Sequence, residues 1–284
     1  MPGTTVGEAL SDAKRSIERR DAEYLLSHLL GTSRASIIAH SDRQIDPAAA
    51  ARFRQWVAAR ADGKPVAQIL GVREFYGRDF AIDEHVLIPR PETETLVEQA
   101  LARISKQKSL KTPANRRLSI LDLGTGSGIV AITVKLEAPD CEVVAVDASA
   151  AALRNARANA ATLNAPVRFL DSNWYGALDG QCFDVIVSNP PYVAVDDPHL
   201  SRGDLRFEPM MALTDQSPDG LASIRAITAG ALAHLRPNGW LMLEHGYNQA
   251  EAVRQLMGEA RLTAVQSTRD LAGIERVTSG QRPA

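Results

Sequence analysis

The chain has 284 residues, of which 45% are hydrophobic, and its formal net charge at pH 7 is −2. This length and apolar content allow two domains with full cores, whereas the near-neutral charge lacks the basic excess typical of proteins that bind nucleic acids. Two cysteines are too few for a disulfide framework, and no apolar run approaches the ~20 residues that span a bilayer. The first residues also lack the pattern of a signal peptide, so we expect a cytoplasmic protein with no membrane partner.

Residues 1–70 predict a small helical domain. Apolar residues from Val6 to Ile17 recur at helical spacing, and Pro47 begins a further predicted helix that ends near Asp62. The stretch contains no strand pattern and none of the cofactor motifs described below. We therefore expect this domain to dock a partner protein rather than to bind a cofactor.

Residues 71–88 predict a connector with the pattern of a β-hairpin. The short runs that predict strands around turns are residues 69–71, 73–77, 80–82 and 86–88. A helix should follow, with Pro91 at its first position and Glu92 and Glu94 at the positive end of its dipole. Residues 106–117 are polar and basic and contain Pro113, so we expect a loop there.

From residue 118 onward the predicted strands and helices alternate. Strands are expected at residues 118–123, 141–147, 167–171, 183–189 and 240–245, and helices at residues 129–137, 150–163, 221–235 and 249–259. Continuous apolar strands separated by helices indicate a parallel sheet that is covered on both faces. Two further predicted strands, at residues 262–267 and 274–278, are close enough in the chain to pair antiparallel. The sequence therefore predicts an α/β fold with a doubly wound sheet over residues 89–284.

A glycine-rich loop lies directly between the first strand of this sheet and the next helix, with the sequence Asp122-Leu123-Gly124-Thr125-Gly126-Ser127-Gly128. Glycines let the backbone turn tightly and approach a ligand closely, and this loop lies at the edge of a doubly wound sheet where ligands bind. The spacing is not the G-x-G-x-x-G of dinucleotide-binding folds, and no Gly-Lys-Ser/Thr follows. A nucleotide phosphate loop is therefore not expected, and a purely structural turn is the alternative to a cofactor loop.

Asp147 ends the second predicted strand of the sheet. An acidic side chain at this position of a doubly wound fold can accept hydrogen bonds from ribose hydroxyls, while a carboxylate that caps the helix beginning near Ser149 is the alternative. Together with the glycine loop, Asp147 indicates a ribose-bearing cofactor without a pyrophosphate. The six histidines and two cysteines show no metal-ligand spacing, so we expect no metal.

Over residues 118–280 the chain resembles the class I S-adenosylmethionine-dependent methyltransferases. The resemblance implies a Rossmann-like sheet of seven mostly parallel strands with an antiparallel last strand. It also implies that S-adenosylmethionine is the cofactor, that residues 124–128 wrap its methionine part and that Asp147 binds its ribose. Asp122 would hold either the glycine loop or the methionyl amino group.

The turn Asn189-Pro190-Pro191-Tyr192 follows the fourth predicted strand. Two consecutive prolines fix φ and donate no N–H, so the turn is rigid and its carbonyl groups stay free as acceptors. Together with the Asn189 side-chain oxygen, these acceptors can clamp both N–H groups of a planar NH₂, and Tyr192 can cover its face. Such a nitrogen is a poor nucleophile because its lone pair is delocalised, and positioning against an activated methyl group is the help that it needs. An ordinary rigid turn is the alternative.

This turn resembles the signature of methyltransferases that act on planar amino nitrogens of adenine or glutamine. Four further runs narrow the resemblance to one family: Ile88-Pro89-Arg90-Pro91-Glu92-Thr93-Glu94, Arg206-Phe207-Glu208-Pro209 followed by Ala212-Leu213, Glu244-His245-Gly246 and Glu275-Arg276-Val277-Thr278. They closely resemble the release factor glutamine methyltransferases, across almost the whole chain. The resemblance implies methyl transfer to the glutamine amide N5 in the Gly-Gly-Gln motif of bacterial class-one peptide chain release factors, by a monomer that binds no nucleic acid.

The resemblance also assigns contacts to single residues. The family's substrate contacts map onto residues 189–192, and its cofactor contacts map onto residues 124–128, Asp147, Trp174 and Asn189. Trp174 would lie against the adenine. Asn173 departs from the family, which commonly has Asp at this position to contact the adenine amino group. An amide oxygen can still accept that hydrogen bond, but without the charge.

Some alternatives stay open at this stage. A glutamine methyltransferase for a ribosomal protein and an adenine N6 DNA methyltransferase share the chemistry, although the latter must contact phosphates and flip a base. A non-catalytic module that senses the cofactor would have no use for the amide clamp at Asn189. For Arg206 and Glu208, a contact with the partner and a buried ion pair are equally compatible with the sequence.

Overall fold

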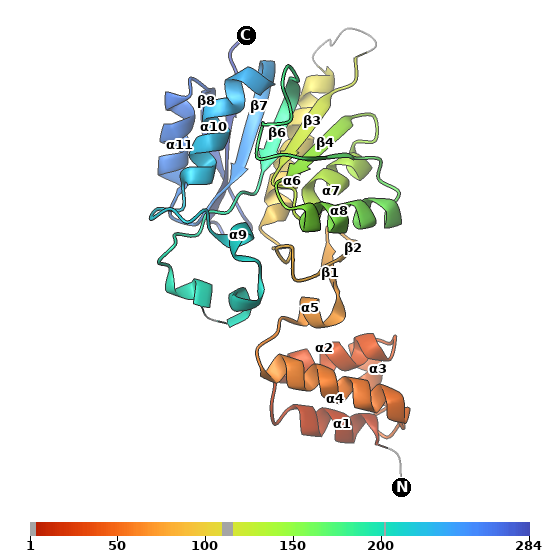
Figure 1. Ribbon diagram of the computed structural model, residues 1–284. Coiled ribbons are helices and arrows are strands. Elements are labelled where there is room, and N and C mark those ends of the chain that lie inside the picture. The colour runs from red at the N-terminus through yellow and green to blue at the C-terminus, as the bar shows by residue number, and fades with distance from the viewer. Residues whose placement is uncertain (1–3, 110–115, 202) are drawn as a thin grey trace. The chain divides into compact units, whose positions relative to one another are not determined.

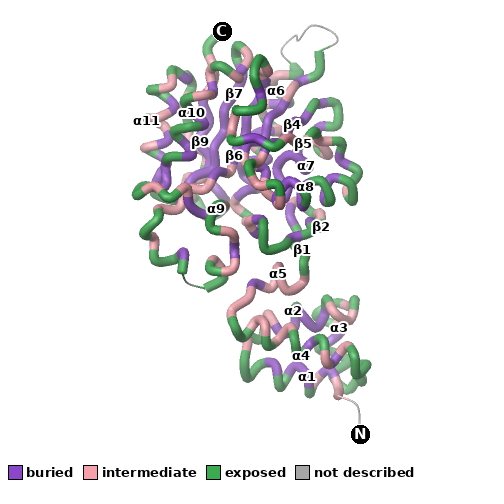
Figure 2. The backbone as a smooth tube through the Cα atoms, in the orientation of Figure 1, coloured by how far each residue is buried: buried purple, intermediate pink, exposed green. Residues whose placement is uncertain are grey.

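The computed structural model describes residues 4–109, 116–201 and 203–284, and the chain divides into two compact units (Figure 1). The first unit is Met1–Val72 together with Gly203–Phe207, and the second is Arg73–Arg202 together with Glu208–Ala284. A short segment from the second half of the chain thus belongs to the first unit. Each unit has a hydrophobic core of its own (Figure 2).

The first unit is a small bundle of helices around Leu25, Leu26 and Phe53, all of which are buried. Its longest helix begins at Pro47 because the Asp46 side chain accepts hydrogen bonds from two backbone N–H groups of the first turn. The helices of this unit are α1 (Val6–Ala13), α2 (Arg19–Leu29), α3 (Arg34–Ala39), α4 (Pro47–Ala61) and α5 (Val66–Leu70), with the 3₁₀ helix η2 (Gly203–Phe207).

The predicted hairpin is present as β1 (Val72–Phe75) and β2 (Arg78–Ala81). The prediction of further strands on either side of it is wrong. Residues 69 and 70 belong to α5, which ends where Gly71 adopts the left-handed conformation. Residues 86–88 form no strand, because the Ile88 N–H donates to the Glu208 carboxylate instead of to a neighbouring strand.

Helix α6 (Thr93–Ser109) differs from its prediction at both ends. Pro91 lies in the turn before the helix, whose carbonyls accept from Thr93 and Glu94, and is not the first helical residue. At the other end, Lys106 and Lys108 are helical, where their positive charges favour the negative end of the helix dipole. The expected loop therefore begins later, and residues 110–115 lie outside the described residues.

The sheet of the second unit has seven strands in the order β5-β4-β3-β6-β7-β9-β8. The strands from β5 to β7 are parallel, and β9 pairs antiparallel with both β7 and β8. The bounds are β3 (Ser119–Leu123), β4 (Glu142–Asp147), β5 (Arg168–Asp171), β6 (Phe183–Ser188), β7 (Leu235–Glu244), β8 (Thr263–Arg269) and β9 (Glu275–Gln281). The predicted fold class is confirmed. Strand β7 begins earlier than expected, because Leu235 pairs with Phe183 across an irregularity in the register.

Helices cover this sheet on both faces, as the complete burial of β6 requires (Figures 1 and 2). Helix α7 contacts both α6 and α8, and α10 contacts α11. The bounds are α7 (Ile129–Glu137), α8 (Ala150–Thr162), α10 (Ala222–His234) and α11 (Ala250–Glu259), and η1 (Pro198–Ser201) and α9 (Met210–Leu213) lie between β6 and α10. Because the parallel strands share one direction, the loops after β3, β4 and β6 meet at one edge of the sheet.

Candidate active site

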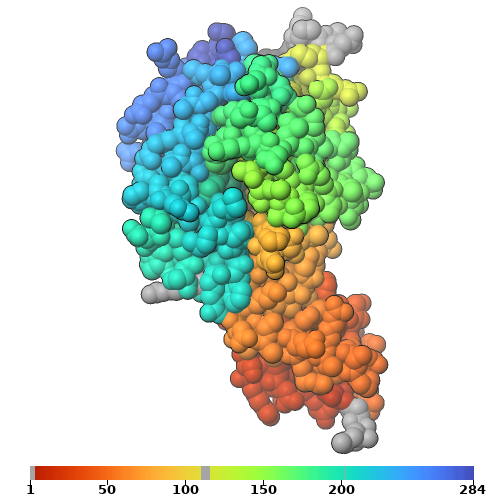
Figure 3. Space-filling view, viewed as in Figure 1, coloured from red at the N-terminus to blue at the C-terminus, as the bar shows by residue number. Residues whose placement is uncertain are grey.

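A pocket of about 420 Å³ opens at this edge of the second unit. It is lined by the loops that follow β3, β4, β5 and β6, by the segment before α6 and by the segment from α9 to α10. In the space-filling view these segments, coloured orange, green and cyan, lie side by side on one face of the unit (Figure 3). The structure thus brings loops from distant parts of the chain around one cavity.

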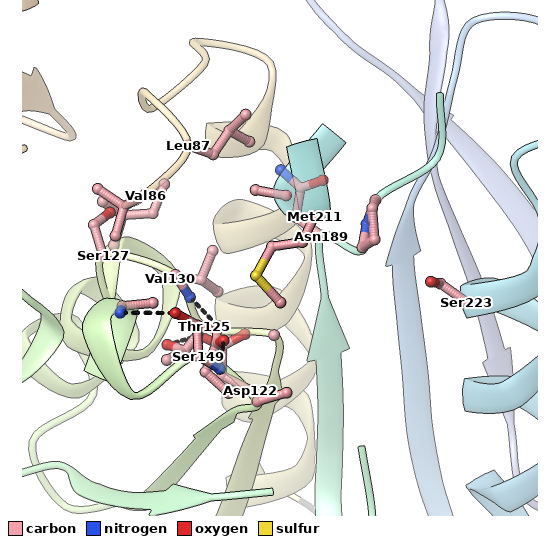
Figure 4. Close-up of a pocket in the computed structure, with 18 of the residues that line it drawn as sticks. Val86, Leu87, Asp122, Thr125, Ser127, Val130, Ser149, Asn189, Met211 and Ser223 are labelled. Atoms are coloured by element: carbon pink, nitrogen blue, oxygen red, sulfur yellow. Dashed lines mark hydrogen bonds between the residues drawn. The ribbon is translucent and has the colours of Figure 1, made fainter. Parts of the chain in front are cut away.

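Asp122 is buried beneath the glycine loop and holds it in place. Its Oδ2 accepts hydrogen bonds from Thr125 Oγ1 at 2.7 Å and from the Ala131 N–H at 3.1 Å. Figure 4 shows Asp122, Thr125 and Ser149 close together on one side of the pocket. Burial raises the pKa of Asp122 to about 7, although both hydrogen bonds oppose the rise.

Asp147 connects the end of β4 to the glycine loop. Its Oδ2 accepts from the Gly126 N–H at 2.8 Å, and its Oδ1 accepts from the Ser149 N–H at 2.8 Å. The N-cap of α8 is Ser149 rather than Asp147, since the Ser149 side chain accepts from Ala152. Asp147 lines the pocket, and its burial raises its pKa. Each carboxylate oxygen keeps a lone pair with which it can bind a ligand hydroxyl.

The three glycines of the loop have different structural roles. Gly124 and Gly126 line the pocket, and a Cβ on Gly124 would lie 3.3 Å from the Trp174 ring, which also lines it. Gly128 does not line the pocket. It begins the turn into α7 with a φ of 84°, and a Cβ on it would lie 2.8 Å from the Ile132 side chain. The glycine at this position is needed for close packing of the helix.

Thr125, Ser127, Asn173 and Asn189 also line the pocket, so it contains every expected cofactor contact except Gly128. Asn189 follows β6, and its Nδ2 donates to Thr93 Oγ1 at 3.1 Å. No described residue donates a hydrogen bond to Asn189 Oδ1. The amide is therefore oriented with its nitrogen bound and its oxygen left for a ligand.

The rest of the proline turn is anchored to the second unit. Pro191 lines the pocket, whereas Pro190 is buried and does not. Tyr192 Oη donates to Glu244 Oε1 at 3.4 Å, and the Tyr192 carbonyl accepts from Gln249 Nε2 at 3.0 Å. The backbone of the turn is thus held from β7 and from the start of α11, while the Tyr192 hydroxyl is directed at Glu244.

Glu208 forms a buried ion pair, which is one of the two roles that the sequence left open for it. Its side chain is fully buried and forms an ion pair with Arg90, while its Oε2 accepts from the Ile88 N–H at 2.9 Å. Arg206 has a different partner, the carbonyl of Asp62. The buried ion pair therefore joins the segment that precedes α6, which lines the pocket, to the segment that precedes α9, and α9 itself lines the pocket through Met211 and Ala212.

Sequence reasoning missed the pocket residues that lie outside short motifs. Examples are Met211, which Figure 4 shows beside Asn189, and Ser223 at the start of α10. Thr93 accepts a hydrogen bond from Asn189 Nδ2, and no local pattern in the sequence indicates this contact. Its place inside a motif was the only signal available. In the part of the chain that is described, no group of three His, Cys, Asp or Glu residues could hold a metal ion, and no helix is long and apolar enough to cross a membrane.

Comparison with known proteins identifies the family. The chain matches the model of the PrmC N-terminal domain over residues 5–71 and the model of the methyltransferase small domain over residues 107–202. It is 51% identical over 274 residues to the release factor glutamine methyltransferase of Burkholderia pseudomallei, covering 94% of this chain and 93% of that protein. It is 48% identical over 278 residues to the protein of the same name from Bordetella pertussis, covering 98% and 99%.

A solved structure supports the fold. The 16S rRNA N2 G1207 methyltransferase of T. thermophilus, in complex with AdoMet and guanosine, superposes with a TM-score of 0.51 at 21% identity, over 74% of this chain and 49% of that one. At this identity the likeness concerns the fold alone. Membership in a family rests on the near full-length relatives and on the motifs that the pocket brings together. The chain belongs to the release factor glutamine methyltransferase family.

Proposed function

We propose that the protein transfers a methyl group from S-adenosylmethionine to the side-chain amide N5 of the glutamine in the Gly-Gly-Gln motif of bacterial class-one peptide chain release factors. The observation that carries the proposal is the orientation of Asn189. Its nitrogen is bound by Thr93, and its oxygen is left as an acceptor in a pocket that the glycine loop also lines. This arrangement suits a planar NH₂ group as the substrate.

The polar and aromatic side chains of the pocket are suited to the ribose and the adenine of S-adenosylmethionine. Asp147 can accept from ribose hydroxyls, Trp174 offers a ring face for the adenine, and Asn173 offers an amide beside it. The backbone of residues 124–127 would surround the methionine part, with Asp122 holding the loop from below. When bound, the cofactor supplies a methyl group that is activated by the positive charge on sulfur.

In this proposal the residues of the chain position the target amide and take no part in proton transfer. Asn189 Oδ1 would accept from one N–H group of the target amide, and a backbone carbonyl of the proline turn would accept from the other, which fixes the plane of the amide. An amide nitrogen is a weak nucleophile because its lone pair is delocalised. Alignment of this nitrogen with the methyl group therefore raises the reaction rate, because the bound amide is already held in a near-attack geometry. The product nitrogen can lose its proton to water, so no side chain is assigned as a general base.

The helical unit has a separate task in this proposal. We assign residues 1–70 to docking of the release factor, residues 71–88 to a connector and residues 89–284 to the methyltransferase domain. Every residue that lines the pocket belongs to the second unit, which leaves the first free to recognise the partner. We further infer that the protein acts as a monomer in the cytoplasm, without nucleic acid.

The test compares substrates directly. The purified protein is incubated with labelled S-adenosylmethionine and, in separate reactions, with a class-one release factor, ribosomal proteins or duplex DNA. We expect label only on the glutamine of the Gly-Gly-Gln motif, located by peptide mapping. Label on a ribosomal glutamine or on adenine, with none on the release factor, would refute the proposed substrate.

A further inference from the structure

The buried side chain of Gln249 links three segments of the second unit. Its Nε2 donates to the carbonyls of Tyr192 and Asp219, both at 3.0 Å, and its Oε1 accepts from the Gly246 N–H at 2.8 Å. We propose that Gln249 is a positioning residue for methyl transfer, which ties the proline turn to the segment between α9 and α10 and so keeps Asn189 in place in the pocket. The inference rests on the proposed function and adds to it a residue that does not itself line the pocket.

The three hydrogen bonds match the capacity of the amide group of Gln249. A glutamine amide has two N–H donors and one oxygen acceptor. In the structure two carbonyls face its NH₂ group and one N–H faces its oxygen. The reversed amide would place its oxygen against two carbonyl oxygens and its NH₂ against another N–H, so all three bonds would be lost. The neighbouring segments therefore fix the orientation of Gln249.

The side chain of Gln249 does not serve its own helix. The residue is the N-cap of α11, but its side chain makes no capping hydrogen bond within this helix, all of which the structure describes. The residues that cap a helix with their side chains are the shorter Ser, Thr, Asp and Asn. Because the three hydrogen bonds of the Gln249 side chain lie outside α11, the residue contributes to the arrangement of the surrounding loops.

Two of the segments that Gln249 joins are walls of the pocket. The lining residues are Asn189 and Pro191 from the proline turn, and Thr214, Asp215, Gln216 and Ser223 from the segment that contains Asp219. Figure 4 shows Asn189 and Ser223, one from each wall, on separate elements. A displacement of either wall relative to the other would change the shape of the cavity in which the target amide is held.

A side chain is needed for this link because of the prolines. Farther along the chain the two walls are joined by their own backbones, since the Val193 N–H donates to the Leu213 carbonyl at 2.9 Å. The two prolines have no N–H with which to continue this pairing. The carbonyls of Tyr192 and Asp219 are both acceptors and cannot bind each other. The NH₂ group of Gln249 bridges them, so the attachment reaches the residue that directly follows the prolines.

Two glycines leave room for this bridge. A Cβ on Gly220 would lie 2.2 Å from the Tyr192 carbonyl oxygen, and a Cβ on Gly246 would lie 2.9 Å from Gln249 Oε1. Gly220 also has a φ of 65°, which glycine adopts without strain. A larger residue at either position would displace one of the groups that the bridge connects.

The position of the turn should determine the rate of the proposed reaction. The target nitrogen must face the methyl group, and a misplacement of ~1 Å at a reacting centre can lower a rate by about 10²-fold. Loss of the bridge would leave the Tyr192 and Asp219 carbonyls without this donor and allow the turn, with Asn189, to shift. The glycine loop and Asp147 would still bind the cofactor, so the loss should affect transfer more than cofactor affinity.

The experiment uses the full-length protein with two substitutions of Gln249. Gln249→Met keeps the length of the side chain and removes both donors, whereas Gln249→Glu keeps the acceptor but turns a second oxygen toward the two carbonyls. Methylation of the release factor is measured at saturating concentrations of both substrates. We expect kcat to fall roughly 10- to 100-fold in both variants. The Kd for S-adenosylmethionine, measured by calorimetry, should stay within about threefold of the parent value.

Two controls on α11 separate positioning from stability. Gln255→Met changes an exposed glutamine of the same helix and should match the parent. Val253→Ala removes buried volume but no group that could hydrogen-bond to the turn, so it should lower the unfolding temperature while kcat stays within about threefold at a temperature where the protein is folded. A kcat within about threefold of the parent in Gln249→Met, or an equal loss of kcat in Val253→Ala, would overturn the inference.

A second readout needs no substrate. In the parent protein labelled with ¹⁵N, the Gln249 side-chain NH₂ protons should exchange slowly with solvent, because both are donated and the residue is buried. The signals of the Asn189 side-chain NH₂ should shift in Gln249→Met but not in Val253→Ala. Rapid exchange at Gln249 in the parent, or an unshifted Asn189 signal in Gln249→Met, would contradict the bridge.

The exchange measurement is made on the parent protein, so it tests the bridge even if a Gln249 variant does not fold. It also distinguishes the two proposals. If the exchange and the shifts are as expected but the parent does not methylate the release factor, the proposed function fails while the positioning of Asn189 by Gln249 stands.

Discussion

At the scale of single residues, the site depends on which atom of an amide faces the pocket. The sequence identifies Asn189 as an acceptor, but only the hydrogen bond from Nδ2 to Thr93 leaves Oδ1 available for that purpose. The same residue type with its amide reversed would present donors to the substrate. The chemistry of the clamp is thus decided by a neighbour that lies far away in the chain.

Asn189→Ala should lower the methylation rate by ~10²–10³, because it removes one preorganised polar group from a reacting site. The thermal unfolding temperature and the affinity for S-adenosylmethionine, measured by calorimetry, should change little. In Asn189→Asp a carboxylate still accepts from the target NH₂, so some activity should survive, and its charge should favour the bound cofactor over the transition state. A folded Asn189→Ala variant with a rate within about threefold of the parent, less than the ~1.4 kcal/mol of a tenfold effect, would rule out the clamp.

Two glycines of the same loop should respond differently to alanine. Gly128→Ala places a Cβ 2.8 Å from Ile132 and 3.2 Å from Ala156 at a φ of 84°, so we expect a loss of stability of about 1–3 kcal/mol. Gly126→Ala meets nothing within 4 Å, although its φ is 56°, and the added methyl group lies in the pocket lining. It should mainly weaken cofactor binding. Denaturant unfolding and calorimetry on both variants check this contrast, and equal effects on stability would contradict it.

At the scale of elements, buried Glu208 fixes two segments that have no regular structure. It pairs with Arg90 and accepts from the Ile88 N–H, so the segment before α6, which lines the pocket, is held to the segment that leads into α9. A helix or strand satisfies its own backbone groups, whereas these segments require a side chain to do so. The motifs around Arg90 and Glu208 are thus one structural unit.

Glu208→Ala should destabilise the second unit and weaken cofactor binding together. It leaves the buried Ile88 N–H without its acceptor, at a cost of about 1–3 kcal/mol, and it removes the partner of Arg90. Asp140→Ala is the matched control, because its ion pair with Lys108 is exposed and should contribute at most about 1 kcal/mol. Denaturant unfolding and calorimetry should separate the two variants; equal unfolding midpoints would show that the buried pair is dispensable.

At the scale of the whole molecule, the two units have separate cores and separate tasks in the proposed function. Phe53 is buried in the core of the helical unit, and its replacement by alanine should cost that unit about 3–5 kcal/mol. We expect Phe53→Ala to bind S-adenosylmethionine as the parent does but to methylate the intact release factor more slowly. Calorimetry and kcat/KM on the intact partner test this expectation. Unchanged kcat/KM in a variant whose helical unit has unfolded would remove the docking role.

The buried carboxyls of the second unit should also make folding depend on pH. Burial raises the pKa of Glu244 from 4.5 to about 7, so the folded state binds a proton more tightly than the unfolded chain does. This contribution to stability is fully present below pH 4.5 and is lost as the pH rises through 7. His245, whose pKa is lowered by burial, acts in the opposite direction. Relative to the parent, Glu244→Gln should therefore gain unfolding temperature between pH 5 and pH 8. A difference that does not change with pH would contradict the raised pKa.

Local residue patterns predict the alternation of strands and helices, the glycine loop at the end of β3 and the proline turn at the end of β6. These features are local, since apolar periodicity, glycine and proline act on the backbone of their own segment. The order of parallel strands then brings the ends of β3, β4 and β6 to one edge, so the region of the pocket could be predicted as well. The family resemblance supplied the expected cofactor and substrate.

The remaining features depend on how distant segments of the chain pack together. The partner of Glu208 is Arg90 rather than the nearby Arg206, Gly128 packs against α7 instead of lining the pocket, and residues 203–207 return to the helical unit. The nitrogen of Asn189 faces Thr93, which begins α6. Each of these depends on contacts between segments that are far apart in the chain. Local patterns carry no information about such contacts, because burial and hydrogen-bond partners are set only when the whole core has packed.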